Sequence, residues 1–323
     1  MRERPEAIDE DQILAAVEER WDLDIRQVSY VPEGGGSYHW RGSGGGGEWF
    51  VTVDDLTSKS WLGADEDSAF EGLCVAFDTA RRLQQAGRSF VVAPLESSGG
   101  ATLERVSSRY SVAVFPFVSG QAGTFEKSWP EPERTQLVAV LAELHGSTPV
   151  VADLIRRREL SIPGRESLIA ALADLSRPWS SGPFAEPARV ALAAHADAVR
   201  TWLSVFDELA GEVARSDPAW VVTHGEPHGG NSIRTSAGLA LIDWDTVALA
   251  PAERDLWMLE DQPHALADYT ELTGVTPRRA GLGLYRLAWT LTDLAAFVVV
   301  LRSPHHDNAD TRRALTSFTS YLG

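Results

Sequence analysis

The fold is decided by two segments, HGEPHGGN at His224–Asn231 and LIDWD at Leu241–Asp245. The first places a carboxylate, Glu226, five residues before an amide, Asn231. The second ends a hydrophobic run on another carboxylate, Asp243. In a phosphoryl-transfer centre one carboxylate takes the proton of the acceptor hydroxyl, while the amide and the other carboxylate hold Mg²⁺ against the nucleotide phosphates. The spacing therefore predicts Glu226 as the base and Asn231 and Asp243 as metal ligands.

These segments resemble the motifs of the aminoglycoside phosphotransferase and choline kinase family, H-x-D-x-x-x-x-N followed by I-D-[WFY]-[DE]. The resemblance implies an α+β, two-lobed protein-kinase-like fold. A small antiparallel-sheet lobe at residues 1–118 would bind the nucleotide, and a mainly helical lobe at residues 119–323 would carry catalysis and the acceptor. The implied reaction moves the γ-phosphoryl of ATP or GTP, with Mg²⁺, to a hydroxyl of a small cationic molecule such as an aminoglycoside-type antibiotic. Choline-like amines and sugars are alternative acceptors.

Two positions depart from the family pattern. Glu226 stands where the family usually has aspartate, so its carboxylate reaches one methylene further, which general-base chemistry still permits. Thr52 stands where the third strand of the family carries a lysine that contacts the α- and β-phosphates. Lys59 and Arg41 are near in sequence and could substitute, but the spacing requires neither. A catalytically inactive nucleotide-binding or scaffold protein would explain both departures together.

A metal-dependent hydrolase is a more distant alternative. His224, Glu226 and His228 alternate along the chain, and with Asp243 they could form a set of four metal ligands. The proline and glycines between them favour a loop over an extended strand. The phosphotransferase interpretation also accounts for Asn231, which the hydrolase leaves without a role.

A glycine turn in the N-terminal part is the candidate phosphate loop. Strands are predicted near residues 25–30, 38–41 and 48–53 from their β-branched and aromatic residues, with a hairpin tip at residues 42–47. The turn between the first two strands consists of Gly34, Gly35 and Gly36. Bare backbone N–H groups can approach a phosphate closely, so these three glycines, with Thr52, are the predicted phosphate-side contacts.

A buried strand is predicted at Ser111–Val118, SVAVFPFV, and leads into the hinge between the lobes. In a kinase-like arrangement the hinge backbone bonds the adenine edge and apolar side chains hold the ring. Phe115, Phe117 and Val118 are therefore the predicted adenine contacts. The alternative for the two phenylalanines is a place in the hydrophobic core.

Helical spacing of apolar residues predicts several helices. They lie at Ile8–Trp21, Asp65–Gln85, Glu131–His145, Pro187–Ala214 and Gly283–Leu301. Glu66 and Glu71 of the second helix are candidates to pair with a phosphate-binding lysine.

Acidic residues after the metal strand are the predicted acceptor contacts. Glu260, Asp261 and Asp268 follow the second motif, in the region where the family builds its acceptor pocket, and they could bind ammonium groups. Asp245, within the motif, could contact metal or substrate. The alternatives are a structural acid for Asp245 and solvated surface acids for the other three.

Composition limits the partners. The chain of 323 residues has a formal charge of −17, which disfavours nucleic acid and anionic membranes and is compatible with a cationic acceptor. Cys74 is the one cysteine, so no intrachain disulfide or cysteine metal cluster forms. The N-terminus lacks the apolar region of a signal peptide, and the apolar stretch Leu294–Leu301 is too short to span a bilayer. The sequence predicts a cytoplasmic monomer or homodimer.

Overall fold

The computed structural model describes residues 1–5, 7–125 and 129–323. The chain divides into two compact units, one of Glu3–Arg158 with Ala219–Arg278 and the other of Glu159–Pro218 with Arg279–Gly323. Every predicted nucleotide, metal and catalytic residue belongs to the first unit. The boundary predicted at residue 118 concerns the two sides of a nucleotide site, and it stays a prediction.

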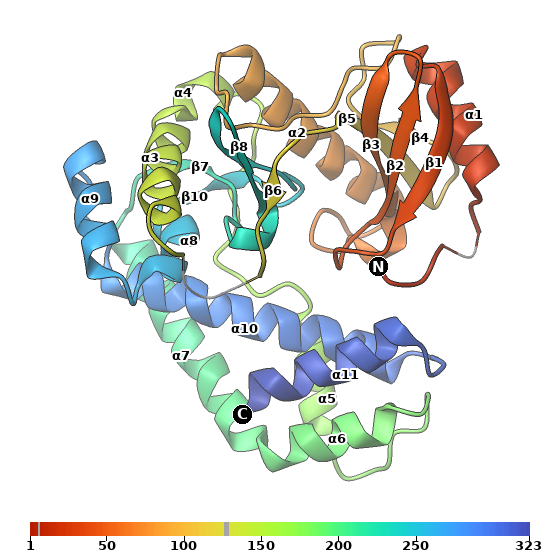
Figure 1. Ribbon diagram of the computed structural model, residues 1–323. Helices are drawn as coiled ribbons and strands as arrows, with labels where there is room; N and C mark the ends of the chain where they lie inside the picture. Colours follow the sequence, from red (N-terminus) through yellow and green to blue (C-terminus); the bar gives the residue numbers. More distant parts are fainter. Residues whose placement is uncertain (6, 126–128) are drawn as a thin grey trace. The chain divides into compact units, whose positions relative to one another are not determined.

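The first unit is built on an antiparallel sheet of five strands, in the order β1-β2-β3-β5-β4 (Figure 1). The strands are β1 (Ile25–Val31), β2 (Tyr38–Gly44), β3 (Gly47–Asp55), β4 (Glu104–Arg105) and β5 (Tyr110–Pro116). The predicted strands are present, but β2 runs on to Gly44, which pairs with Gly47. The predicted six-residue tip is therefore a tight turn. Gly44 is required there because a Cβ would lie 1.7 Å from the backbone oxygen of Asp24.

Two helices cover opposite faces of this sheet. α1 (Glu10–Trp21) begins at a capping box formed by Asp9 and Gln12, and it packs on the face that carries Val112 and Val114. α2 (Glu66–Gln85) packs its Leu73 and Phe77 against Ala113, which points to the other face. Full burial of such an aliphatic or aromatic side chain contributes about 1.5–3 kcal/mol. Successive side chains of β5 point to opposite faces of the sheet, so this one strand contacts both helices.

In the rest of the first unit, short strands flank the loops that carry the two motifs (Figure 1). β7 (Trp220–Thr223) pairs with β10 (Ala248–Pro251), and β6 (Gln121–Ala122), β8 (Ser232–Thr235) and β9 (Gly238–Leu241) form a second small sheet. Hydrogen bonds of Phe90 and Val92 with Leu241 join the chain before β4 to this region. The helical elements here are η1 (Leu56–Ser58), α3 (Glu133–Gly146), α4 (Thr148–Val151), η2 (Gly229–Asn231), α8 (Glu253–Leu256), η3 (Trp257–Leu259) and α9 (Pro263–Thr273).

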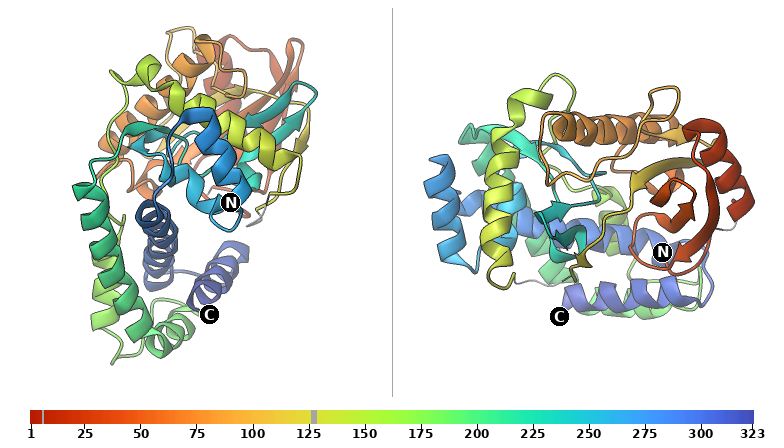
Figure 2. Two further views of the ribbon diagram at one scale, coloured as in Figure 1. Left: turned by 90° about the vertical axis from the view of Figure 1, so that its left-hand side faces the viewer. Right: turned by 45° about the horizontal axis from the view of Figure 1, so that its top comes forward.

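The second unit is helical, which confirms the α+β class with a mainly helical C-terminal part (Figure 2). It contains α5 (Arg165–Ala173), α6 (Ala185–Ala194), α7 (Ala196–Arg215), α10 (Arg279–Arg302) and α11 (Ala309–Leu322). The single helix predicted over Pro187–Ala214 is wrong. The chain breaks at His195, whose ring Nδ1 lies 2.9 Å from the carbonyl of Ala191, so that α6 ends and α7 begins.

α10 is the long apolar helix of the second unit. It packs against α5, α6, α7 and α11, and Leu291, Leu294 and Leu301 are fully buried. Among the described helices it alone is long and apolar enough to cross a membrane, with a mean hydropathy of 1.6. A core helix meets the same criterion, so the helix does not decide the predicted cytoplasmic location.

Candidate active site

The hairpin of β8 and β9 brings the predicted metal ligands together. Its register places Ser232 opposite Leu241, and beyond this pair the amide of Ile242 donates to the carbonyl of Asn231 at 3.0 Å. Asn231 and Asp243 therefore lie at the same open end of the hairpin. The spacing between the two motifs is the length that this short hairpin needs.

A tight loop orients the amide of Asn231. Its Nδ2 donates to the backbone carbonyl of Glu226 at 3.1 Å, and that carbonyl also accepts from the amide of His228 at 2.8 Å. The backbone N–H of Asn231 donates in turn to the carbonyl of His228 at 2.9 Å. Because Nδ2 is bonded to the loop, Oδ1 is the atom of this side chain that can take a cation.

Asp243 is an exposed carboxylate in negatively charged surroundings. Its backbone has a φ of +64°, a left-handed conformation that costs energy in most residues and recurs at functional sites. The protein packed around it raises the pKa of its carboxyl well above the ordinary value, and the charges of Asp245 and Glu226 add to this effect against the opposing Lys59. Oxygen ligands in an excess of negative charge suit Mg²⁺. Asn231 and Asp243 therefore fit the predicted ion.

A buried lysine lies beside this carboxylate. The Lys59 side chain is 0% exposed, and its Nζ is 2.8 Å from Asp54 Oδ1 and 2.7 Å from Asp245 Oδ2. Nζ also donates to Ser37 Oγ at 3.0 Å, and this hydroxyl donates to Asp54 at 2.6 Å. Burial alone would lower the pKa of the ammonium, but Asp245, Asp54 and Asp243 together raise it above its usual value. Lys59 is thus a permanent positive charge.

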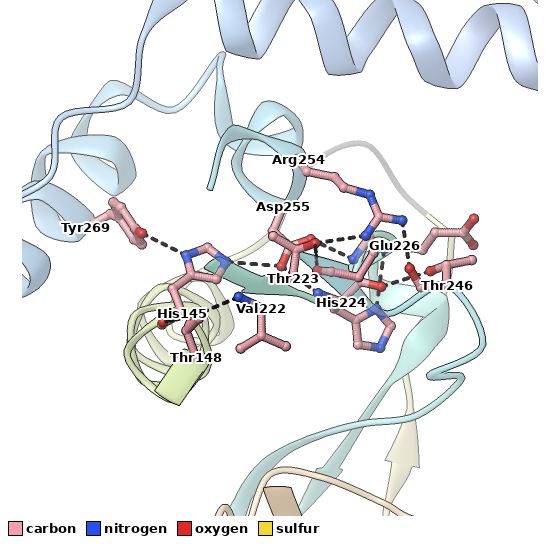
Figure 3. Close-up of polar contacts among 12 residues, drawn as sticks. His145, Thr148, Val222, Thr223, His224, Glu226, Thr246, Arg254, Asp255 and Tyr269 are labelled. Carbon is pink, nitrogen blue, oxygen red and sulfur yellow. Dashed lines mark hydrogen bonds and ion pairs between the residues drawn. The ribbon is translucent and has the colours of Figure 1, made fainter. Parts of the chain in front are cut away.

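The beginning of the catalytic loop is fixed by one buried carboxylate, Asp255 (Figure 3). It accepts the backbone amides of His224 at 2.8 Å and Gly225 at 2.6 Å. Asp255 Oδ2, the oxygen that accepts the His224 amide, also lies 3.1 Å from His145 Nε2, and His145 Nδ1 is 2.7 Å from the hydroxyl of Tyr269. Burial raises the pKa of the Asp255 carboxyl, but the interaction with His145 and the positive charge of Arg254 hold this pKa below its ordinary value.

Arg254, the residue before Asp255, stabilises the same loop (Figure 3). Its guanidinium donates to Thr223 Oγ1 and to the carbonyl of Thr246, both at 2.8 Å. The Thr246 hydroxyl donates to the carbonyl of His224 at 2.8 Å. Gly225 is necessary between them, because its φ is +98° and a Cβ would lie 2.3 Å from the guanidinium. These hydrogen bonds explain how the buried guanidinium of Arg254 is satisfied by protein acceptors.

His224 is a structural histidine in this arrangement. Its Nε2 is 2.9 Å from the carbonyl of Ile242, and its Nδ1 accepts the amide of Glu226 at 3.3 Å. Burial lowers the pKa of the ring, so the neutral form fits both contacts. With both nitrogens used, His224 is not available as the metal ligand of a hydrolase. Within residues 1–5, 7–125 and 129–323, no group of three His, Cys, Asp or Glu residues is placed to hold a metal.

The glycine turn lies above the buried lysine. Gly34, Gly35 and Gly36 are exposed, and Gly34 has a φ of +82°. A Cβ on Gly36 would be 3.7 Å from Lys59 Nζ, whereas one on Gly35 would have no neighbour within 4 Å. Around Gly35 and Gly36 the turn therefore has little side-chain bulk, and the ammonium of Lys59 lies close to it, which suits a phosphate loop.

Thr52 is buried in the sheet next to this turn. Its Oγ1 is 3.2 Å from His39 Nδ1 on the neighbouring strand, and the His39 ring stacks on Phe50. Burial is the main reason why the pKa of His39 is lowered to about 3. The position that carries lysine in the family is therefore occupied here by a neutral pair.

The predicted hinge residues are half-buried at the end of β5. Phe115 packs edge-on against Phe77 in the α2 core, with ring centroids 5.6 Å apart. The amide of Phe117 donates to the carbonyl of Glu48 at 3.2 Å, and the guanidinium of Arg41 lies 4.3 Å from its ring centre. The Phe117 amide is therefore bonded within the protein, and Arg41 covers its ring. Val118 continues the chain beyond the sheet.

The predicted acceptor acids fall into two groups. Asp245 forms an ion pair with Lys59 Nζ at 2.7 Å, and its acceptor role stays a prediction. Glu260 is half-buried after η3, and Asp261 is exposed before α9, so their acceptor role stays a prediction. Glu66 and Glu71 of α2 are both exposed, and the partners of Lys59 are aspartates from other segments.

Several contacts around the motifs were not predicted from the sequence. Lys59 was named only as a possible substitute for the strand lysine, and its partners were not predicted, although it is one of only two lysines in the sequence. His145 and Tyr269 lie far from the motifs in sequence, and no pattern joins them to Asp255.

Comparisons with known proteins agree with this geometry. A model of the phosphotransferase enzyme family, APH, matches residues 76–297. Protein StrN of Streptomyces griseus is 26% identical over 334 residues, covering 96% of this chain and 92% of that protein. The spectinomycin phosphotransferase APH(9)-Ia, in complex with ADP and spectinomycin, has a TM-score of 0.76 at 18% identity, over 98% of this chain and 95% of that chain. The amicoumacin kinase hAmiN, in complex with AMP-PNP, Ca²⁺ and Ami, has a TM-score of 0.59 at 14% identity, over 98% and 93%.

These findings confirm the predicted kinase-like fold. The family match covers more than half of the chain and includes both motifs. The hydrolase alternative has neither a ligand set among the described residues nor a family match to support it.

We expect Asp255→Asn to destabilise the protein by about 1.5–3 kcal/mol, because an amide cannot accept the amides of His224 and Gly225 and also bond His145. Urea unfolding at pH 7 measures the change. Asp268→Asn, at an exposed position of α9, is the matched control and should change the free energy of unfolding by less than about 0.5 kcal/mol. Equal effects of the two substitutions would contradict the anchoring role.

His39 predicts a pH dependence of stability. Its folded pKa of about 3 is below the ordinary 6.5, so its contribution to stability is present above pH 6.5 and is lost as pH falls from there towards the folded value. We expect His39→Gln to flatten the decline in the free energy of unfolding between pH 7 and pH 4, measured with urea. The same substitution at exposed His264 is the control, and a parallel decline in both variants would contradict the assignment.

Proposed function

Because the chain belongs to the phosphotransferase enzyme family, we propose that it moves the γ-phosphoryl group of ATP or GTP to a hydroxyl group of a small, cationic molecule. One observation carries the proposal. The β8–β9 hairpin and the loop before it gather Glu226, Asn231 and Asp243, three groups with the chemistry of phosphoryl transfer.

Each of these residues has a separate task. Glu226 accepts the proton of the acceptor hydroxyl, and its backbone position is set by His224 and Asn231. Asn231 Oδ1 and the carboxylate of Asp243 would hold Mg²⁺, which would supply positive charge against the transferred phosphoryl group. The glycine turn Gly34–Gly36 covers the phosphates with backbone N–H groups.

The nucleotide side of the proposal has support from the related structures. The structure of APH(9)-Ia is a complex with ADP and that of hAmiN is a complex with AMP-PNP and Ca²⁺, and both share the fold of this chain. In this chain Phe115, Phe117 and Val118 would line the adenine side. The amide of Phe117 already has an internal partner, so adenine would meet this residue through other atoms.

The acceptor is proposed from charge and from similarity. The formal charge of −17 favours a cation, and Glu260 and Asp261 provide carboxylates after the second motif. Spectinomycin is bound by APH(9)-Ia. An amine-bearing antibiotic with free hydroxyl groups is therefore the first class to screen, with choline-like amines and sugars next. We place the enzyme in the cytoplasm, where ATP is supplied, as a monomer or homodimer.

We expect calorimetry to show ATP or GTP binding that depends on Mg²⁺ and is lost in Asp243→Asn, because the variant removes a charged ligand of the ion. The exposed substitution Asp268→Asn should leave binding unchanged. Absence of nucleotide binding by the wild-type protein would refute the proposed reaction.

Removing the base should affect turnover and spare binding. We expect Glu226→Gln to keep Mg²⁺-dependent nucleotide binding and to lower acceptor-dependent phosphate transfer by about 10²–10⁴-fold. Glu226→Asp, which restores the usual family residue, keeps the carboxylate and should retain more activity than Glu226→Gln. The assay follows transfer of labelled γ-phosphate to amine-bearing hydroxyl compounds. Nucleotide binding without transfer in any wild-type assay would favour the scaffold alternative.

A further inference from the structure

Strand β3 lacks the lysine that a kinase-like nucleotide site uses, yet a lysine is buried in the same region. Thr52 occupies the strand position and bonds His39. Lys59 follows η1, a few residues later, and its Nζ contacts Asp54, which belongs to β3 itself. One of the two lysines in the sequence is therefore fully buried beside β3, the strand in which the expected lysine is missing.

The segment before Lys59 is rigidly built. Asp55 caps η1 by accepting the amide and hydroxyl of Thr57, at 3.1 and 2.6 Å, and it is paired with Arg109 at 2.5 Å. Leu56 is buried, and its carbonyl accepts the amide of Lys59 at 3.2 Å. The backbone therefore holds the lysine in place without a ligand.

The charges around Lys59 are unbalanced. Asp54 and Asp245 contact the ammonium of Lys59, and the charge of Asp243 also acts on it. Glu226 is a fourth carboxylate, whose charge acts on Asp243. Triphosphate adds further negative charge under the glycine turn. Without the ammonium, Asp54 and Asp245 would face the phosphates uncompensated and repel them.

We propose that Lys59 is the fixed cation of the nucleotide site, moved from strand β3 to the loop after η1, where it holds Asp245 next to Asp243 beneath the glycine turn. It is a positioning residue, because all three ammonium protons have protein partners in Ser37, Asp54 and Asp245. This inference rests on the proposed function, since it assigns the polyphosphate of ATP or GTP to the Gly34–Gly36 side of Lys59.

Adenosine and ATP separate this role from folding. Both carry the same base and ribose, but adenosine has no phosphate, so a cation on the phosphate side affects ATP alone. We expect Lys59→Met to weaken Mg²⁺-dependent ATP binding, measured by calorimetry, by about tenfold or more and to leave adenosine binding unchanged. Lys59→Arg keeps the charge and should fall between the wild type and Lys59→Met.

Two double variants keep the test decisive if Lys59→Met folds poorly. Lys59→Met with Asp54→Asn removes one of the two carboxylates left unpaired, and we expect it to fold and to recover part of the ATP affinity. Lys59→Met with Thr52→Lys returns a cation to β3, and we expect ATP affinity to rise above that of Lys59→Met. Thermal unfolding of each variant accompanies the titrations.

The outcomes are distinct. ATP binding by Lys59→Met equal to that of the wild type would overturn the assignment, as would an equal loss of ATP and adenosine binding, which would mark Lys59 as a folding residue only. Failure of the wild type to bind either ATP or GTP would overturn the proposed function and this inference with it. Wild-type nucleotide binding with an unaffected Lys59→Met overturns the inference alone.

Discussion

The site depends on the bonds that the buried carboxylate of Asp255 makes to the amides of His224 and Gly225. They fix the backbone where the chain leaves β7, and this anchor determines where the rest of the catalytic loop begins. A side-chain amide has one acceptor oxygen where the carboxylate has two, so it could not accept the two backbone amides on separate oxygens as Asp255 does. The cost of burying the charge is offset by three hydrogen bonds, which is why Asp255 lies in a network with His145 and Tyr269.

The second constraint is electrostatic. The same carboxylates that suit a divalent cation would repel a nucleotide, so the site needs positive charge before any ligand arrives. Lys59 supplies it from the protein, and the geometry of η1 keeps it there. An ammonium with three protein partners loses little by being buried, whereas an exposed lysine would exchange its contacts with water. With Lys59 placed after β3, the site keeps a positive charge although Thr52 occupies the strand position.

The sequence predicted the parts of the site that are local. Glu226, Asn231 and Asp243 lie within two short segments, and a hairpin is the simplest way to join them, so their proximity could be inferred from spacing. The β-branched and aromatic residues of β1, β2 and β3 and the apolar run of β5 likewise predicted these strands. The break at His195 was missed because helical spacing continues through it. The partners of Asp255 and Lys59 were missed because burial brings together residues that are distant in sequence, and no spacing records it.

The glutamate at position 226 acquires a specific meaning from this rigidity. Its amide is bonded to His224 and its carbonyl to Asn231 and His228, so the backbone is held on both sides of the residue. A shift of the chain cannot absorb the extra methylene, because such a shift would break the contact that orients Asn231. The longer side chain can therefore place its carboxylate further from the loop than an aspartate could. We expect the reach of residue 226 to influence which acceptor hydroxyls fit, because the base must come within hydrogen-bond distance of the hydroxyl.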